Sequence, residues 1–430
     1  TTQGKFNQPE RVTVNANVNV TEKPTLFYNP KMSSSEFIDV QQFLFDKDFY
    51  TPYVPYQNYG PFSPAVEILI KKQTGQLSSS EAEAQINALR KYDVRNDFEK
   101  YVYRKSVSQQ YSINLSGGGK NMNYSLSAGF DKNSFNLIGD QSERKSFSFS
   151  NNIIPLKNLQ LQANIFYVET NGYNNSIGDY GSGSWKIRSL LYGGVDLYPY
   201  AQLADAQGNP LTIANSYGTI FTDTAGNGKL LDWKYRPLQE IKNNDKQNKT
   251  NSILADLSLK YNFFPGLDVE IKYQFQKENV ASHSYYNLQS YLTRDLINSY
   301  AQIQNDNVIY IVPKGGILDE SSSELVANNI RAQFNYNTLW RNKHELTVIT
   351  GTEVRERNIT SRNNRVYGFN METLSFANVD LTNSFPVYAG TGNVVIPSEN
   401  GFGKKINRFV TIYGNSGYTF GEGYTISGRV

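Results

Sequence analysis

Few residues of this 430-residue sequence have the types and spacing that catalysis or metal binding requires. The absence of cysteine excludes disulfides, thiolate zinc sites and thiol nucleophiles. The two histidines, His283 and His344, are far apart in the sequence and have no patterned acidic partners. We therefore expect both histidines to be surface residues, and the sequence predicts no enzyme, no catalytic residue, no metal site and no cofactor.

Two short runs look like ligand-binding loops but lack the required spacing. Residues 116–120 read SGGGK, which is not the GxxxxGK[ST] spacing of a phosphate loop and joins two expected strands. Residues 223–232 read DTAGNGKLLD, without the DxDxDG spacing and terminal Glu of a calcium loop. We interpret the first run as a Gly-rich hairpin turn, and for the second a calcium site is only the minor alternative.

Ligand contact is the one chemistry for which the sequence offers candidates. Segment 170–250 is dense in Gly, Asn, Asp and aromatic residues, and aromatic faces stack on sugar rings or grip peptide side chains in a wet cleft. The alternative is that these rings pack the long loop against itself or a neighbour. The predicted ligand-contacting residues are Trp185, Tyr192, Tyr198, Tyr200, Trp233 and Tyr235.

Strict alternation of apolar and polar residues indicates the scaffold that carries this segment. Tyr111, Ile113 and Leu115 share one face of an expected strand, opposite serine and asparagine side chains. A period of two residues is typical of antiparallel strands with two different faces. We count about eleven such strands, the last incomplete. The clearest alternating runs are 12–20, 111–116, 124–130, 159–167, 253–263, 267–275, 330–340, 346–354 and 408–420.

Short and long connections alternate between these strands, so the short turns lie at one end of the sheet and the long loops at the other. The short turns read GGGK, PLKN, FPG, RNKH and GEG. Short periplasmic turns, long extracellular loops, a lipid-facing apolar side and a polar lumen are typical of an outer-membrane barrel. A soluble β-sandwich, the alternative, would not need long loops at one end only. The long loops are expected at 21–105, 131–145, 170–250, 277–325 and 356–407.

Further features agree with an all-β transmembrane antiparallel barrel. No run of 18 apolar residues exists, so no transmembrane helix is predicted, and a net charge of +3 gives no support for a nucleic-acid partner. Two helices are expected in loop 21–105, one starting at the serines before Glu36 and one capped by Ser80 and Glu83. Two interfacial aromatic girdles are predicted. Their residues are Phe263, Trp340 and Phe420 by the turns, and Phe130, Phe147, Tyr167 and Phe275 by the loops.

The order and wording of several segments resemble the SusC/RagA class of TonB-dependent outer-membrane transporters. TTQGK at 1–5 resembles the end of that class's plug domain, and 96–130 resembles the class's segment of the type DW-x-D-x-hydrophobic-x-R followed by YNLSVSGGSEKTNYYVSLGY. Segments 267–279, 344–356 and 415–430 resemble successive barrel strands. Asp97-Phe98 departs from the class's usual aromatic-acid wording, and the chain has no TonB-contacting segment.

The resemblance implies a 22-stranded barrel with an N-terminal plug, of which residues 1–5 are the end of the plug and 6–430 the N-terminal half of the barrel. We accordingly expect a fragment of a longer protein. The implied function is TonB-dependent import of oligosaccharides or peptides across the bacterial outer membrane. The implied partners are membrane lipid, a SusD-like surface lipoprotein, and TonB-ExbB-ExbD acting through the missing plug segment. The alternative is a plug-less or non-transporting barrel that serves as a scaffold or binding subunit.

Overall fold

A single antiparallel sheet forms most of the molecule. The computed structural model describes residues 5–50, 61–181, 197–390, 392–421 and 423–429. Along the sheet, each strand pairs with the next in the order β1-β2-β3-β4-β5-β6-β7-β10-β11-β15-β16, with short β12 (Ser375–Ala377) beside β11. The expected meander of about eleven strands is confirmed. Its strands are β1 (Gln8–Thr21), β2 (Ser106–Gly118), β3 (Met122–Ser134), β4 (Asp140–Leu156), β5 (Leu159–Asn174), β6 (Asn244–Phe264), β7 (Leu267–Tyr286), β10 (Gly316–Trp340), β11 (His344–Asn370), β15 (Gly401–Phe420) and β16 (Tyr424–Arg429).

The strand register aligns apolar side chains of one face into rows that cross several neighbouring strands. Because side chains alternate between faces, residues that pair across strands share a face. Many members of these rows are exposed, such as Leu257 at 54% and Ile330 at 53%. One face of the sheet is therefore a continuous apolar surface, as a lipid-facing wall requires. One row crosses the six strands from β5 to β15 through Ala163, Leu257, Tyr273, Ile330, Val354 and Val410.

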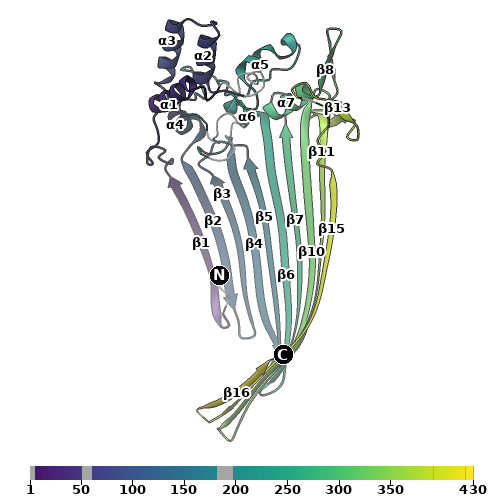
Figure 1. Cartoon of the computed structure of the whole chain (residues 1–430). Helices are drawn as coiled ribbons and strands as arrows, with labels where there is room; N and C mark the ends of the chain where they lie inside the picture. Colours follow the sequence, from purple (N-terminus) through teal and green to yellow (C-terminus); the bar gives the residue numbers. More distant parts are fainter. Residues whose placement is uncertain (1–4, 51–60, 182–196, 391, 422, 430) are drawn as a thin grey trace.

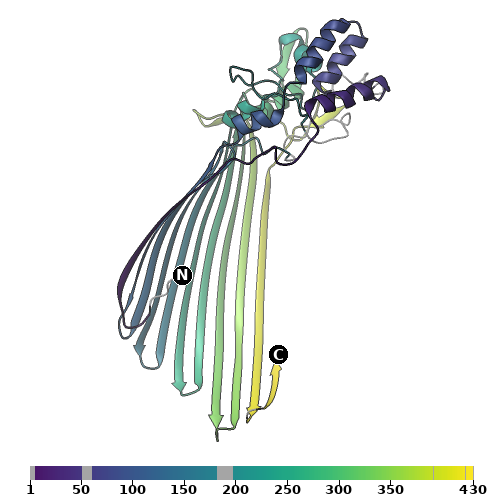
Figure 2. The same ribbon diagram turned by 90° about the vertical axis from the view of Figure 1, so that its left-hand side faces the viewer.

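The sheet is a curved single layer with unlike ends (Figures 1 and 2). The hairpin turns β2–β3, β4–β5, β6–β7, β10–β11 and β15–β16 all lie at one end, and the helices gather at the other. Among the described residues β1 and β16 do not pair with each other, so the sheet is open. The predicted division between turns and insertions is thus confirmed.

The strands extend beyond the boundaries that alternation predicts. Strand β7 continues to Tyr286, β11 continues to Asn370, and β10 already begins at Gly316, all inside expected loops. The expected loop 131–145 is wrong, because β3 and β4 are joined by residues 135–139 alone, with Gly139 at φ 101°. The added strand lengths are mostly polar, and their few apolar residues do not alternate regularly with polar ones, so alternation does not reveal these lengths.

The insertions fold into a cap over one end of the sheet. No helix in the described ranges is long and apolar enough to cross a membrane. The cap packs around several apolar cores, the largest of which joins the first insertion to residues of the segment 197–213. Its helices are α1 (Ser34–Asp46), α2 (Pro64–Gln73), α3 (Ser79–Leu89), α4 (Val94–Asp97), η2 (Phe98–Val102), α5 (Thr219–Thr224), η4 (Ala225–Gly228), α6 (Pro237–Asn243) and α7 (Tyr291–Ser299). Its small sheets are β8 (Ala301–Gln304) with β9 (Asn307–Tyr310), and β13 (Ser384–Pro386) with β14 (Asn393–Val395).

The helix starts follow capping chemistry. Helix α1 begins at the serines before Glu36, as predicted, and a capping box between Ser33 and Glu36 holds this start. The second box uses Ser78 and Glu81, two residues before the predicted pair, and the buried face of α3 is formed by Ala82 and Ile86. Helix α2, capped by Ser63, was not predicted at all.

Candidate functional site

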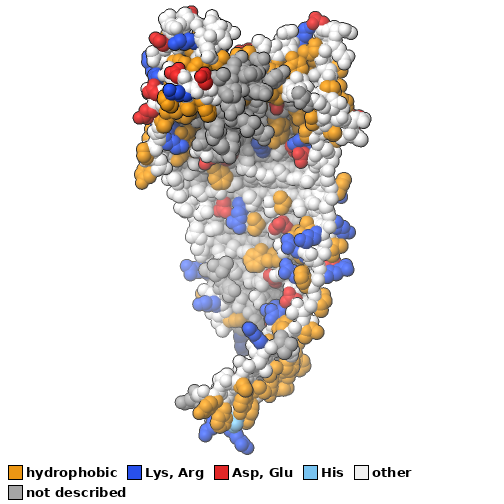
Figure 3. Space-filling model, viewed as in Figure 1, with side chains coloured by type: hydrophobic (Ala, Val, Ile, Leu, Met, Phe, Trp, Pro, Cys, Tyr) orange, Lys and Arg blue, Asp and Glu red, His pale blue; other side chains and the backbone are white. Residues whose placement is uncertain are grey.

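The face opposite the apolar rows is a polar wall. In Figure 3 the face turned to the viewer is mainly white, with charged side chains toward its right-hand strands. Hydrogen bonds between neighbouring strands order these side chains: Ser150 Oγ donates to Asn164 Oδ1 at 2.7 Å, and Gln274 Nε2 donates to Asp256 Oδ1 at 2.8 Å. Such a wall suits a water-filled lumen.

A depression of about 310 Å³ lies in this wall across β5, β6, β7, β10 and β11. Its charges have both signs, since Lys272 Nζ lies 3.1 Å from Glu270 and Asn329 donates to Glu353 Oε1 at 3.1 Å. Exposed ion pairs are weak, so these groups are free to exchange their partners for a polar ligand. The principal lining side chains are Asp256, Lys272, Gln274, Asn329, Arg331 and Glu353.

Arg331 is the most firmly held cation of the depression. Its Nε donates to Tyr413 Oη at 2.7 Å, its Nη2 donates to Gln333 Oε1, and its guanidinium lies over the Tyr413 ring at 5.2 Å. A guanidinium held in this way is suited to binding a carboxylate. We did not single it out from the sequence, although the polar residues at 329, 331, 333 and 335 alternate with apolar ones and carry that signal.

Two of the predicted ligand residues, Tyr198 and Tyr200, lie in the core of the cap. Tyr200 is 1% exposed, and its hydroxyl donates to Gln41 Oε1 at 2.7 Å. The two tyrosine rings lie 4.8 Å apart, and burial raises the pKa of both hydroxyls above their usual range. Tyr200 thus joins the 197–213 segment to α1, and Tyr198 packs against Tyr200 in the same core.

The other described candidates, Trp233 and Tyr235, pack in the same way. Trp233 is 2% exposed and its Nε1 donates to Asp295 Oδ1 at 2.7 Å, while Tyr235 lies 5.0 Å from the Tyr291 ring. Trp185 and Tyr192 lie outside the described residues. The observed contacts of the four described residues are those of side chains that pack the loop against itself or a neighbour. Contact of these residues with a ligand stays a prediction.

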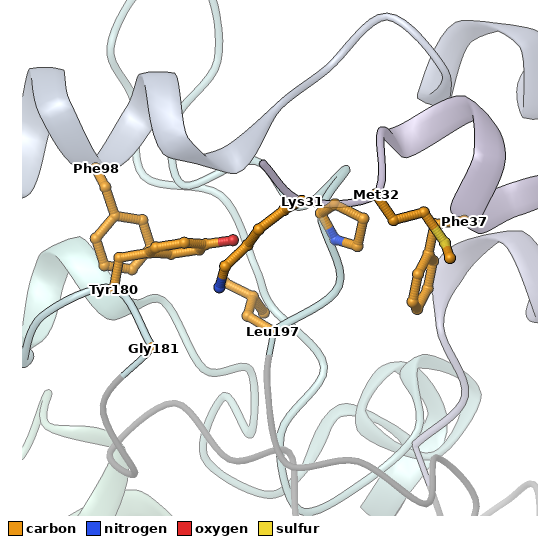
Figure 4. Close-up of a pocket in the computed structure, with 8 residues that line it drawn as sticks. Lys31, Met32, Phe37, Phe98, Tyr180, Gly181 and Leu197 are labelled. Carbon is orange, nitrogen blue, oxygen red and sulfur yellow. The ribbon is translucent and has the colours of Figure 1, made fainter. Parts of the chain in front are cut away.

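A hollow of about 260 Å³ lies beside this core, at the base of the cap (Figure 4). Lys31 Nζ lies 4.5 Å from the centre of the Tyr180 ring, and Phe98 packs against the same ring at 5.4 Å. Met32 and Phe37 line its other side. The hollow thus combines one cation with an apolar, aromatic lining.

Contacts between insertions hold the cap together. On α2, Glu67 accepts hydrogen bonds from Thr219 N at 3.2 Å and Thr219 Oγ1 at 2.5 Å, which joins the first insertion to the one after β5. Glu240 accepts from Tyr291 N at 3.0 Å and joins that insertion to the one after β7. Burial raises the pKa of both carboxyls.

The remaining polar candidates have ordinary partners. His344 Nδ1 lies 2.7 Å from Tyr418 Oη, and the imidazole stacks on Trp340 at 5.1 Å. His344 is therefore part of the aromatic cluster by the turns, and it is less isolated than we expected. Asp223 pairs with Lys234, and no group of three or more His, Asp or Glu within the described ranges is placed to hold a metal ion.

Comparison with known proteins places this geometry in a known fold. No protein-family model and no curated protein matches the chain. Among solved structures, the RagAB peptide transporter is similar with a TM-score of 0.65 and 16% identity, over 99% of this chain and 42% of that chain. The RagAB peptide importer in its closed-closed state matches with a TM-score of 0.63 and 16% identity, over 100% of this chain and 42% of that one.

The chain therefore spans less than half the length of the structures it matches. At this identity the likeness concerns the fold, and it agrees with the apolar rows, the polar wall and the one-sided cap described above. The likeness confirms the fold that the resemblance in sequence predicted: this chain folds as part of a large antiparallel β-barrel similar to that in the RagAB structures.

Proposed function

We propose that the chain is the N-terminal half of the barrel of a TonB-dependent importer for oligosaccharides or peptides in the bacterial outer membrane. The observation that carries this proposal is the likeness of the chain over its whole length to the RagAB peptide transporter. In the proposal, residues 1–5 end a plug domain and further strands complete a 22-stranded barrel, because lipid cannot satisfy the free backbone groups of an open sheet edge.

The inner wall supports passage of a hydrated polar substrate. Its depression contains Arg331 and Lys272 together with Asp256 and Glu353, so it presents both donors and acceptors. Mixed charges suit the termini and side chains of a peptide, and the asparagine and glutamine side chains beside them suit sugar hydroxyls.

The proposed partners act at the two ends of the barrel. A SusD-like lipoprotein would cover the cap, where Val40 and Phe43 of α1 and Phe27 before it are exposed, Phe43 at 59%. Exposed apolar side chains grouped on one element are suited to a protein interface. TonB-ExbB-ExbD would act from the turn side through the plug.

Uptake by whole cells tests the proposal. A strain lacking the gene is compared with a complemented strain for uptake of fluorescent peptides and oligosaccharides, each with the proton-driven motor active or inactivated. We expect complementation to restore motor-dependent uptake of one substrate class. Normal uptake of both classes without the gene, with the lipoprotein still co-purifying with the barrel, would instead support the scaffold alternative.

A further inference from the structure

The outward face of the sheet carries a polar trough beyond the apolar rows. The trough has a volume of about 400 Å³ and crosses β6, β7, β10 and β11. The trough lies outside the lumen, because its main lining side chains share a face with Ile253 of β6 and Ile330 of β10. Its main lining residues are Gln247, Lys249, Ala281, His283, Glu320 and Arg362.

The register places two cations on either side of a low floor. Lys249 pairs with Ala281, Ala281 with Ser322, and Ser322 with Arg362. Neighbouring strands lie about 4.8 Å apart, so the backbones of Lys249 and Arg362 are about 14 Å apart. Ala281 and Ser322 are too short to fill the space between the two long side chains, and an anionic group of a ligand fits there.

The charges of the trough are available to such a ligand. Among the described residues Arg362 has no ion-pair partner, and Lys249, whose side chain is 52% exposed, makes a long ion pair of 3.7 Å with Glu169. The one acidic side chain of the lining, Glu320, lies 3.8 Å from His283 Nδ1. With Lys249, Arg362 and Glu320 ionised, the lining has a net positive charge.

The height of the trough above the apolar rows indicates that its ligand belongs to a membrane lipid. Lys249 lies four residues beyond Ile253, the last apolar outward residue of β6, which is about 13 Å along the strand. For a strand tilted by about 35–45° this is about 10 Å above the apolar rows. That is the level of the polar headgroups, whose acyl chains would lie along the rows below.

We propose that this trough binds the phosphate groups of a phosphorylated glycolipid in the outer leaflet of the surrounding membrane. Lys249 binds one phosphate through the charge of its ammonium group, and Arg362 binds another through the paired N–H donors of its guanidinium group. Tyr285, one step above His283 and in edge contact with Phe369 at 5.8 Å, offers a ring to the sugar. The site concerns how the barrel sits in its membrane and does not depend on what the lumen transports.

Native mass spectrometry of the complete barrel protein in detergent tests this site, with diphosphorylated lipid A as the probe. We expect the lipid to stay bound to the wild type and the doubly substituted Lys249→Ala/Arg362→Ala variant to bind at least about tenfold more weakly, which corresponds to about 1.4 kcal/mol. The charge-conserving Lys249→Arg/Arg362→Lys variant should retain binding. The matched control is Lys132→Ala, which removes an outward cation of β3, paired with Glu143 at 3.0 Å, away from the trough.

Three results would overturn the proposal: equal binding of dephosphorylated lipid A, equal loss with the Lys132→Ala control, or full displacement of the lipid by millimolar inorganic phosphate. Each variant is run on a gel with and without prior heating. A folded barrel migrates faster when unheated than after heating, so this difference shows that the variant has folded. If the alanine variant does not fold, lipid binding to the wild type is measured at increasing salt concentration instead. Binding that does not weaken with added salt would contradict a phosphate site. Substrate uptake by the alanine variant should be unchanged, which separates this test from that of the proposed function.

Discussion

Ile271 and Lys272 are consecutive residues of β7, yet their side chains lie on opposite faces of the sheet. Ile271 pairs with Leu259 and Ala332 on the apolar face, whereas Lys272 Nζ lies 3.1 Å from Glu270 on the polar wall. This single step along the chain passes from the lipid side to the lumen side.

Ile271→Arg should therefore destabilise the barrel by about 2 to 4 kcal/mol if the residue lies near the bilayer midplane, and Lys272→Arg should have almost no effect. The folded fraction of the complete barrel in lipid vesicles, followed through a urea titration, measures both. Equal tolerance of arginine at the two positions would contradict the assignment of faces.

Arg331→Gln should weaken uptake of acidic peptides, because the held guanidinium is replaced by a neutral amide of shorter reach. A hydrogen bond to a charged group contributes about 1.5 to 3 kcal/mol, so the half-saturating peptide concentration should rise about tenfold or more. Uptake of neutral peptides should change little. Arg408→Gln serves as the control, because Arg408 pairs with Glu356 on the outward face, and an equal effect there would exclude a lumen role for Arg331.

Tyr200→Phe should loosen the cap while leaving the barrel intact. The substitution leaves Gln41 Oε1 without its hydroxyl donor in a buried position, at a cost of about 1 to 3 kcal/mol. Hydrogen exchange of α1 and α2 measures the effect, with the exposed Tyr92→Phe as control. Uptake that is altered by Tyr200→Phe while exchange is unchanged would instead favour the predicted ligand contact.

The contribution of buried Glu67 to the stability of the cap should depend on pH. Because burial raises the pKa of Glu67, the folded cap holds this proton more tightly than the unfolded chain, whose carboxyl titrates near 4.5. The contribution to stability is therefore greatest below pH 4.5 and decreases as the pH rises through the folded pKa. Hydrogen exchange at residues 216–222 should increase over this range, and Glu67→Gln should remove the dependence; an unchanged dependence in the variant would assign it to another group.

The barrel wall could be predicted from the sequence because its two faces meet different solvents. Apolar Leu257 faces the lipid side and polar Ser258 faces the lumen side, so the difference between the faces appears in the sequence as an alternation of residue types. Beyond the apolar rows both faces meet polar surroundings, so Ser321 and Ser322 carry no such contrast, and the ends of β7, β10 and β11 could not be placed.

The cap could be predicted only where the chemistry is local. The box of Ser33 and Glu36 lies within four residues, whereas the bond from Trp233 to Asp295 crosses 62 positions and depends on how two insertions meet. An aromatic residue in a polar loop therefore fits packing and ligand contact equally well in sequence. Helix α2 was missed because its Ser63 and Pro64, a good N-terminal pair, follow an aromatic and proline-rich run that suggested a loop.

Each insertion of the cap leaves and re-enters the sheet on adjacent strands, as between Asn174 of β5 and Asn244 of β6. The pairing of those two strands fixes the ends of the insertion whatever its length, and doubling a flexible loop costs only about 0.6 kcal/mol in closure entropy. Whole insertions can thus be exchanged between relatives without shifting a single strand. Such exchange gives evolution a way to change what the mouth of the barrel recognises while the wall that crosses the membrane is inherited unchanged.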